Sequence, residues 1–377
     1  MDIRICHMTS VHKRYDTRIF QHECRSLAAY GYDVCLIVAD GLGDEEKNGV
    51  KIYDVGTNKV SRIKRMISIT KRIEKKALML DCEVYHFHDP ELMFVGLHLA
   101  SKRKKVIVDM HEDHPSYISE AGYIPMRKCV AFFYEKLENY AVKRFSGIVS
   151  TRQTITDRLS KYNPNIELIT NYPNLLNNAP SAEKAGIADN NEIIIAFAGA
   201  VVDSWRHKLI IDAIEDMDNV KYLLAGPVSD EYLSMLKSLK GWNKVQYLGE
   251  VPYDTVGEMY SKASIGVAIY VYCKNMGGTE GNLANTKMFE YMNYGLPFIC
   301  TDFRVWKQIV EEEEKCGICV NPYDQKAIKE AIKYMVTHPA ERRAMGMNSR
   351  MAAQKAYNWE SQEKKLVAFY KRIIGNE

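Results

Sequence analysis

Short apolar segments alternate with amphipathic, helix-like segments through most of this chain of 377 residues. In the first half, the apolar segments are residues 4–8, 34–39, 84–87, 105–109 and 147–150. Strands that are apolar on both faces and separated by helices are typical of a parallel sheet with right-handed crossovers. The pattern therefore predicts a doubly wound α/β domain.

The alternation stops near Asn171 and resumes after a stretch with a different composition. Residues 171–191 are rich in Asn, Pro, Ala and charge, which indicates an interdomain linker. A second α/β series follows, with apolar segments at residues 192–199, 221–226, 245–249, 264–269 and 297–301. The length also favours two domains. We expect an N-terminal domain over residues 1–175, a C-terminal domain over 176–356 and a final helix over 357–377.

Composition and apolar run length exclude several classes of protein. With 46% hydrophobic and 26% charged residues, the chain is an ordinary globular protein. Its longest apolar run, residues 193–202, is about half of the ~20 residues that a membrane-spanning helix needs. The start of the chain lacks the basic and apolar regions of a signal peptide. We therefore expect a cytoplasmic protein.

The nine cysteines imply no disulfide framework. Most of them lie in apolar runs, where a free thiol behaves as a small hydrophobic group. Cys316 and Cys319 form one Cys-x-x-Cys, but a structural zinc site would need a second pair or suitably spaced histidines, and none follows. We interpret the pair as part of a strand that enters the core, with zinc binding as the alternative.

Basic residues are concentrated in the first half, where residues 1–175 carry 27 basic and 22 acidic side chains. Between Lys59 and Lys76, eight basic residues accompany a single acid, Glu74. The same stretch holds apolar residues at roughly helical spacing, namely Ile63, Met66, Ile67 and Ile73. A basic amphipathic helix predicts contact with an anionic membrane surface. A solvated crossover helix is the alternative. No nucleic-acid partner is expected, because interleaved aromatic residues are absent.

Ligands of open parallel sheets bind beyond the carboxyl ends of the strands, so the residues that follow each strand are candidates. The segment after residues 4–8 lacks the glycines of a dinucleotide fingerprint. It offers His12, Asp16 and Arg18 as polar side chains at the mouth of a cleft, with a helix-cap network as the alternative.

Histidines follow two further strands. The His-Phe-His-Asp sequence at residues 86–89 has a spacing that suggests a metal site, but alternating residues at a strand end point to opposite faces. No metal ligand is therefore expected. His111 follows residues 105–109 and is flanked by carboxylates, which fits a general acid or base, or a ligand of sugar hydroxyls. The candidate ligand-binding residues of this domain are His12, Asp16, Arg18, His88, Asp89 and Glu112.

The second domain offers a site for a nucleoside diphosphate. Small and basic residues lie together where the first strand of this domain ends, which suits a diphosphate. Further along, Asn285 or Thr286 can cap a helix that Gly295 ends. Lys287 and Glu290 lie on the polar side of that helix, where they suit phosphate and ribose hydroxyls respectively. The candidate residues for binding this nucleoside diphosphate are Gly199, Arg206, Lys208, Gly226, Leu283, Ala284, Thr286, Lys287 and Glu290.

Four stretches together resemble the motifs of one enzyme family. They are Thr-Ser-Val-His with Asp-Thr-Arg-Ile-Phe, His-Phe-His-Asp-Pro-Glu-Leu, Asp-Met-His-Glu-Asp, and Lys-Met-Phe-Glu-Tyr-Met-Asn-Tyr-Gly-Leu-Pro. The whole chain resembles the GT-B glycosyltransferases of the group 1, or family-four, type, including bacterial capsule and O-antigen enzymes. The resemblance implies two Rossmann-like domains, with the acceptor on the first and a nucleotide sugar on the second. The last helix is expected to cross back to the first domain.

The resemblance also implies the reaction. Transfer is expected to retain anomeric configuration and to need neither metal nor cofactor. The expected partners are a UDP- or GDP-sugar and a lipid-linked or glycan acceptor of surface-polysaccharide biosynthesis. The protein would then work as a peripheral protein on the inner face of the cytoplasmic membrane.

Three residues correspond to the family's catalytic positions. His111 matches the histidine near the transferred sugar, and Glu290 matches the second Glu of the E-x₇-E motif, which holds the ribose. Asn282 stands where the first Glu is expected. An amide still hydrogen-bonds a sugar hydroxyl, but it carries no charge to stabilise a cationic transition state. Two alternatives therefore stay open: a nucleotide-sugar epimerase of the same architecture, and a non-catalytic nucleotide-sugar-binding protein.

Overall fold

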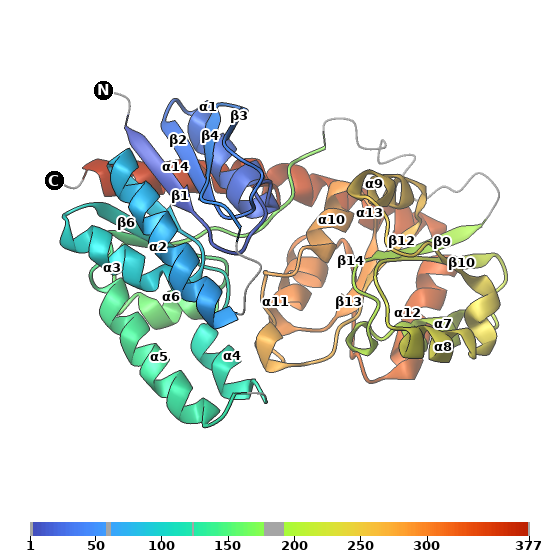
Figure 1. The fold of residues 1–377 in the computed structure, drawn as a ribbon. Helices are drawn as coiled ribbons and strands as arrows, with labels where there is room; N and C mark the ends of the chain where they lie inside the picture. The colour runs from blue at the N-terminus through green and yellow to red at the C-terminus, as the bar shows by residue number, and fades with distance from the viewer. Residues whose placement is uncertain (1–2, 58–61, 123, 177–191, 376–377) are drawn as a thin grey trace. The chain divides into compact units, whose positions relative to one another are not determined.

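The computed structural model describes residues 3–57, 62–122, 124–176 and 192–375. The chain divides into two compact units, Met1–Asn171 with Ser361–Glu377, and Tyr172–Glu360 (Figure 1). The division thus falls after residues 171 and 360, whereas the composition suggests boundaries after residues 175 and 356. Most of the expected linker, residues 177–191, lies outside the described residues.

The first unit contains an eight-stranded sheet in the order β3-β4-β2-β1-β5-β6-β7-β8. Its strands are β1 (Arg4–Met8), β2 (Asp33–Val38), β3 (Glu45–Lys47), β4 (Val50–Asp54), β5 (Val84–Phe87), β6 (Lys105–Met110), β7 (Gly147–Ser150) and β8 (Ile166–Leu168). All pairings are parallel except that of β3 with β4. The carboxyl ends of seven strands therefore lie at one edge of the sheet.

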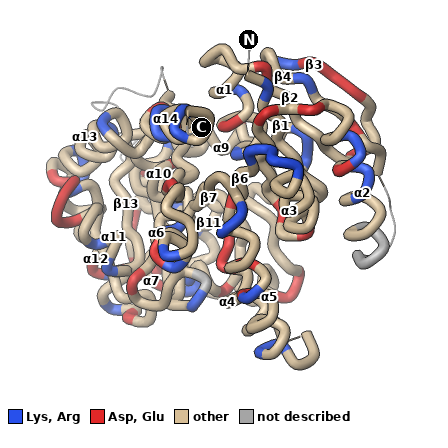
Figure 2. Tube along the Cα trace, turned by 90° about the vertical axis from the view of Figure 1, so that its left-hand side faces the viewer, with Lys and Arg blue, Asp and Glu red and all other residues tan. Residues whose placement is uncertain are grey.

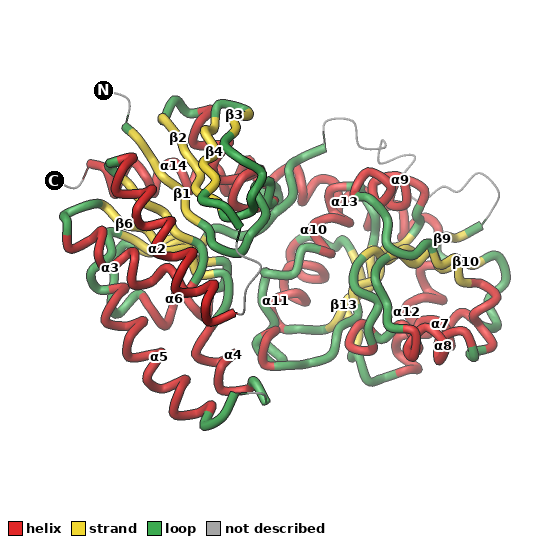
Figure 3. The backbone as a smooth tube through the Cα atoms, viewed as in Figure 1, coloured by secondary structure: helices red, strands yellow, loops and turns green. Residues whose placement is uncertain are grey.

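Helices cover this sheet and connect its strands (Figure 3). They are the π-helix η1 (Thr17–Cys24), α1 (Arg25–Ala29), α2 (Arg62–Leu80), the 3₁₀ turn η2 (Pro90–Leu92), α3 (Met93–Ser101), α4 (His114–Glu120), α5 (Arg127–Val142) and α6 (Gln153–Leu159). The first helical segment begins as the π-helix η1, in which Asp16 O accepts from Gln21 N. Helix α2 turns Ile69, Ile73 and Ala77 toward the core.

The second unit contains a six-stranded sheet, parallel throughout, in the order β11-β10-β9-β12-β13-β14. Its strands are β9 (Ile193–Ala198), β10 (Val220–Ala225), β11 (Val245–Tyr247), β12 (Ile265–Ala268), β13 (Phe298–Thr301) and β14 (Gly317–Val320). Its helices include α7 (His207–Ile214), α8 (Asp230–Lys237), α9 (Tyr253–Lys262), α10 (Lys287–Asn293), α11 (Arg304–Lys307), α12 (Gln325–Thr337) and α13 (Pro339–Lys355). Two Rossmann-like parallel-sheet units confirm the predicted fold class.

Cys316 and Cys319 flank and enter β14, as the core-strand interpretation predicts. The Sγ atom of Cys319 lies 3.6 Å from that of Cys300 on the neighbouring strand. Both thiols therefore belong to the packing of the second sheet.

The last helix, α14 (Trp359–Gly375), returns to the first unit from Ser361 onward, as predicted. Phe369, Tyr370 and Ile373 are buried there. The chain approaches so closely that a Cβ on Gly147 would lie 2.6 Å from Phe369 Cζ. Among the described residues, no helix is both long and apolar enough to span a membrane.

Candidate active site

The carboxyl ends of β1, β5 and β6 are neighbours in the first sheet, so the polar residues near them meet around Asp109. Arg18 holds this carboxylate through two bonds, of 2.7 Å from Nε and 3.0 Å from Nη2. Nε2 of His111 lies 3.1 Å and Nδ1 of His88 lies 3.2 Å from Asp109 Oδ2. Burial alone would raise the pKa of Asp109, but the Arg18 charge and the histidines hold it well below its usual value. Asp109 is therefore an anion that orients His111.

A second buried carboxylate, Asp89, organises the loop after β1. Its Oδ2 accepts from the Thr9 hydroxyl at 2.8 Å and from Ser10 N at 2.6 Å, and its Oδ1 lies 3.0 Å from His12 Nδ1. Burial opposes ionisation, but these contacts outweigh it and lower the pKa of Asp89 to about 2. The hydrogen bond to Asp89 also raises the pKa of His12. The His12 ring stacks on that of His111, with centroids 5.7 Å apart.

Asp16 and Arg18 both have structural roles in this arrangement. For Asp16, this role is the helix cap that the sequence analysis gives as the alternative. Asp16 Oδ1 accepts from the backbone N–H groups of Arg18 and Ile19 at 2.9 and 3.0 Å and caps η1. The Arg18 guanidinium is buried and also reaches Ile169 O and Asn171 Oδ1, at 3.0 and 2.6 Å. Glu112 is exposed between β6 and α4.

The expectation that His86 and His88 point to opposite faces is wrong. Residues two apart on a strand share a face, and only the intervening Phe87 points away. The two imidazoles stack with centroids 4.7 Å apart, and both lie against His7 of β1. His88 is consequently buried, with Nε2 3.0 Å from His7 Nδ1 and Nδ1 facing Asp109.

Glu23 lies beside the cluster of His7, His86 and His88. It is a residue of η1 that the sequence analysis does not identify. Its Oε2 lies 3.7–4.0 Å from a ring nitrogen of each of His7, His86 and His88, and its Oε1 lies 3.2 Å from Arg18 Nε. Burial raises the pKa of Glu23 well above its usual value, and the Asp109 charge adds to the effect. A helical stretch with a lone Glu gives no sequence signal for such a position.

These residues contain groups that could hold a metal ion. Ligand atoms of His7, Glu23, His86 and His88 lie within 4.8 Å of one another, as do those of Cys6, Cys35 and Cys82. His88, Asp109 and His111 form a third group of this kind. In the first group, however, the rings already bond one another and the Tyr370 hydroxyl, which lies 2.7 Å from His86 Nδ1 and 3.2 Å from His7 Nε2. Several ring nitrogens of this group therefore already have partners within the protein, whereas neither Glu23 oxygen nor His86 Nε2 makes a hydrogen bond with any described residue.

In the second unit, two glycines bring the carboxyl ends of β9 and β10 together. A Cβ on Gly226 would lie 1.8 Å from the Gly199 carbonyl oxygen, so only glycine fits at that position. A Cβ on Gly199 would meet Lys287 Cε at 3.2 Å. The first turn of α10 therefore lies beside the end of β9, which joins two expected parts of the donor site.

Glu290 is the acceptor of three hydrogen bonds at this turn. Lys287 Nζ donates to Oε2 at 2.9 Å, the Thr286 hydroxyl to Oε1 at 2.7 Å, and the Tyr260 hydroxyl to Oε2 at 3.2 Å. Thr286 is the N-cap residue of α10 but its side chain makes no cap bond, whereas Asn285 Oδ1 accepts from Lys287 N at 3.0 Å. Tyr260 on α9 is a partner that the sequence analysis does not identify. The carboxylate and ammonium are thereby held side by side and partly exposed.

Asn282 has a local structural role in the loop before α10. Its Oδ1 accepts from Ala284 N at 3.0 Å, and its backbone carbonyl accepts from Trp306 Nε1 at 2.7 Å. Leu283, which follows it, is partly buried. A carboxylate that the sequence analysis does not identify, Glu280, lies two residues upstream and pairs with Arg304 at 2.6 Å.

Arg206 and Lys208 are held apart by different partners. Arg206 has a left-handed backbone (φ 54°), and its Nε donates to Pro322 O at 3.0 Å. Its guanidinium lies over the Tyr323 ring, 5.4 Å from the centroid. Lys208 instead pairs with Asp212 along α7, at 2.7 Å. Arg206 thus lies near the carboxyl end of β14, whereas Lys208 lies on the surface of its own helix.

Two family models match the chain, one in each half. The model described as Glycosyltransferase Family 4 matches residues 17–172, and the model described as Glycosyl transferases group 1 matches residues 180–352. No curated protein matches the sequence.

Solved structures match the chain over nearly its full length. A sucrose-phosphate synthase from Thermosynechococcus elongatus is 16% identical, with a TM-score of 0.75 and coverage of 100% of both chains. HepE of Anabaena, solved with UDP and glucose, is 11% identical, with a TM-score of 0.69 over 98% of this chain and 100% of that one. A UDP-forming trehalose-phosphate synthase from Burkholderia xenovorans is 13% identical, with a TM-score of 0.70 over 99% and 100%. At these identities the likeness shows the fold alone.

Proposed function

The chain belongs to the group 1 glycosyltransferases of the family-four type, and on that premise we propose that it moves a sugar from a nucleotide sugar to a lipid-linked or other glycan acceptor. The observation that carries the donor assignment is the Lys287–Glu290 pair beside Gly199, at the carboxyl edge of a parallel sheet. UDP is the preferred nucleotide in this proposal, since HepE of Anabaena has been solved with UDP-glucose.

The second unit supplies the donor chemistry in this proposal. Lys287 offers a cation for the diphosphate, and Arg206 offers another near the end of β14. Glu290 accepts hydrogen bonds and suits the ribose hydroxyls, provided that they replace the Thr286 or Tyr260 hydroxyl. Cationic side chains stabilise a departing phosphate without a divalent ion. We therefore propose metal-independent transfer with retention of configuration.

The first unit supplies the residues that meet sugar hydroxyls. His111 is partly exposed, and its Nε2 faces Asp109 Oδ2 at 3.1 Å, so the proposal assigns Nδ1 to the substrate. His12 stacks beside it and is fixed by Asp89. A histidine whose tautomer is set by a buried carboxylate is suited to hold or relay a proton at a hydroxyl. His88 acts on substrate only through Asp109, because its ring is buried.

The proposal is tested in two steps. A thermal-shift screen of UDP-, GDP-, ADP- and dTDP-sugars should identify one donor that stabilises the protein, by about 2.7 kcal/mol at 100 times its Kd. Mass spectrometry of the reaction with a glycan acceptor should then show an added sugar. A changed sugar with no acceptor would indicate an epimerase. Donor binding with neither product nor hydrolysis would indicate a binding protein, the outcome that Asn282 makes worth testing.

A further inference from the structure

Helix α5 presents large aromatic side chains to solvent. Phe132 is 53%, Phe133 70% and Tyr140 51% exposed, and Met126, directly before the helix, is 76% exposed. At 3.6 residues per turn, residues 129, 132, 133, 136, 140 and 143 fall within a sector of about 100°. The opposite side of the helix buries Ala131, Glu138, Ala141 and Val142. We call this sector the outward face of α5, the helix labelled in Figure 1.

Basic side chains extend the outward face toward the C-terminal end of α5. Lys136, Tyr140, Lys143 and Arg144 line a surface pocket of about 450 Å³, together with Asn139 and Tyr162. The Arg144 guanidinium lies 3.5 Å from the centroid of the Tyr140 ring, and Lys136 Nζ lies 5.2 Å from that of Phe132. Within the described ranges, Lys136, Lys143 and Arg144 form no ion pair with a carboxylate.

This face differs from that of an ordinary surface helix, whose solvent-facing side is polar. Contiguous exposed apolar side chains mark a surface that another body covers. Aromatic rings suit the headgroup depth of a bilayer, and Lys and Arg beside them suit lipid phosphates. The unpaired cations favour an anionic occupant, and the neighbouring Phe132 and Phe133 favour one with an apolar interior.

We propose that the outward face of α5 docks on an anionic lipid surface, with Phe132 and Phe133 in the headgroup region and the basic pocket on lipid phosphate. The purpose of this docking rests on the proposed function, because a lipid-linked acceptor lies at such a surface. Its test measures binding alone, so it stands or fails separately from the transfer reaction.

The basic run on α2 is the competing surface, since Figure 2 shows Lys and Arg on both helices. Lys59 lies outside the described residues, as do the side chains of residues 62–65. Arg72 is occupied by the carbonyls of Val55 and Gly56, at 3.1 and 3.2 Å. Lys76 Nζ lies 3.8 Å from Asp44 Oδ2, so this cation has a described carboxylate partner, unlike those of the α5 pocket. These contacts favour the crossover-helix interpretation of α2.

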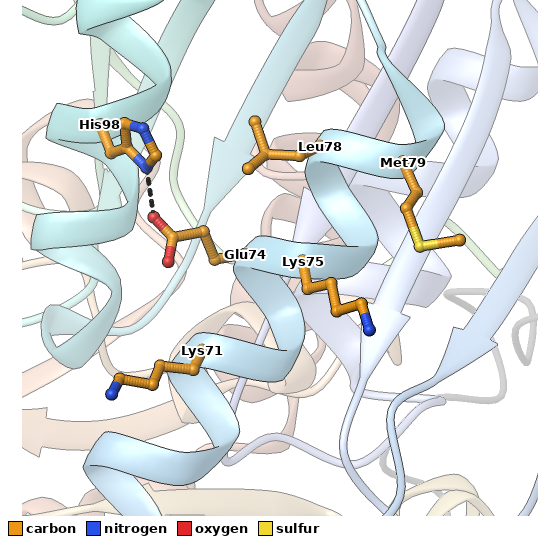
Figure 4. A pocket seen from close by; sticks show the side chains of 6 residues that line it. All are labelled: Lys71, Glu74, Lys75, Leu78, Met79 and His98. Atoms are coloured by element: carbon orange, nitrogen blue, oxygen red, sulfur yellow. Dashed lines mark hydrogen bonds and ion pairs between the residues drawn. The ribbon is translucent and has the colours of Figure 1, made fainter.

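Two exposed lysines on α2 provide a matched control. Lys71 and Lys75 lie at a shallow pocket where Glu74 bonds His98, and Figure 4 shows both ammonium groups clear of that bond. Replacing them by Gln removes two charges from the same unit, as does replacing Lys136 and Lys143. The two double variants therefore have equal net charge and differ only in which surface is changed.

The experiment is co-sedimentation of the full chain with vesicles of phosphatidylcholine and phosphatidylglycerol, and with phosphatidylcholine alone. Wild type should pellet only with the anionic vesicles. Phe132→Ser/Phe133→Ser and Lys136→Gln/Lys143→Gln should each weaken binding by about tenfold or more, whereas Lys71→Gln/Lys75→Gln should not. High salt should weaken wild-type binding, because it screens the lysines.

Several results would overturn the proposal. One is wild type that stays in solution with anionic vesicles, and another is release by the α2 variant but not by the α5 variants. A third is self-association in sedimentation velocity that Phe132→Ser/Phe133→Ser abolishes, since the face would then join two copies of the chain. None of these substitutions touches the candidate active site. Transfer to a soluble glycan acceptor should therefore persist in all variants, and its loss in wild type would count against the proposed function instead.

Discussion

Asp109 and Glu23 share one guanidinium, and their different surroundings separate their protonation states. Arg18 Nε lies 2.7 Å from Asp109 Oδ2 and 3.2 Å from Glu23 Oε1. Burial acts on both carboxyl groups, but the charge of Arg18 and the nearby rings of His111 and His88 keep the pKa of Asp109 low, whereas the pKa of Glu23 rises. Two close carboxyl groups seldom both ionise in an apolar interior. The ionised carboxylate is therefore Asp109, which lies beside His111, the residue that the proposed function places at a substrate hydroxyl.

The Asp89–His12 pair makes the stability of the first unit depend on pH. The pKa of Asp89 falls from 3.8 to about 2 on folding, which corresponds to about 2 kcal/mol of stability. Because the folded value is lowered, this contribution is present above pH 3.8 and is lost as the pH falls through about 2. The pKa of His12 is raised, so its contribution is present below 6.5 and is lost as the pH rises through the folded value.

We therefore expect Asp89→Asn to lower the free energy of unfolding by about 2 kcal/mol at pH 5 and by much less near pH 2. Urea unfolding followed by circular dichroism measures the difference. Asp157→Asn, at an exposed position on α6, serves as the control. An equal cost of Asp89→Asn at both pH values would contradict the assignment.

Glu290 carries the second residue-scale prediction. Glu290→Ala should weaken nucleotide-sugar binding by about 10- to 100-fold, the usual value of hydrogen bonds to a charged group. Isothermal titration with the donor found in the thermal-shift screen measures the loss. Glu258→Ala, at an exposed position on α9, should leave affinity unchanged. Unaltered affinity in a folded Glu290→Ala protein would remove this residue from the donor site.

At the scale of elements, most of the predicted strands have a buried apolar run, although β11 was predicted and has no fully buried residue. β3, β4 and β8 escaped prediction. β3 and β8 are short and no more than partly buried, and β4 alternates buried and exposed residues at its start, so none of them carries such a run. Side-chain spacing does not distinguish the π-helix η1 from an α-helix, because it does not reveal a bond from Gln21 N to Asp16 O. Helix α5 also has helical spacing, but the pattern alone does not show that Phe132 and Phe133 face solvent.

In the candidate site, too, the sequence predicts residues that are close together in the chain and misses partners that are far apart in it. Lys287 and Glu290 were found from sequence because their helix contains both, at i and i+3. Glu23, Tyr260 and Tyr370 were not found, because each joins its cluster from a distant part of the chain. Local patterns specify elements, whereas the partners of a buried polar group depend on how those elements pack.

The return of α14 to the first unit is fixed in part by one hydroxyl. Tyr370 lies 2.7 Å from His86 Nδ1 and 3.2 Å from His7 Nε2, and all three side chains are buried. Tyr370→Phe keeps the ring but leaves two imidazole nitrogens without this partner, so we expect a loss of about 1–3 kcal/mol in unfolding free energy. Tyr334→Phe, on the surface of α12, is the control for removing a phenol hydroxyl. No loss for Tyr370→Phe in urea unfolding would show that water replaces the hydroxyl.

At the scale of the whole molecule, each unit has its own parallel sheet and its own hydrophobic core. The metal dependence of the reaction is a property of the whole chain, and a chelator tests it. We expect EDTA to leave turnover unchanged, because Lys287 and Arg206 offer cations for the diphosphate where other enzymes use a divalent ion. Loss of turnover in EDTA that Mn²⁺ or Mg²⁺ restores would overturn metal-independent transfer.

The distribution of tryptophan allows donor binding to be assigned to one unit. All four tryptophans, Trp205, Trp242, Trp306 and Trp359, lie in the unit Tyr172–Glu360, so tryptophan fluorescence reports the unfolding of that unit. A nucleotide sugar that binds there should raise the fluorescence-monitored midpoint, because a ligand at 100 times its Kd adds about 2.7 kcal/mol. Asp89→Asn lies in the other unit and should lower stability seen by circular dichroism while preserving this ligand-induced shift. A donor that is turned over yet leaves the tryptophan transition unmoved at saturation would place the nucleotide site outside the second unit.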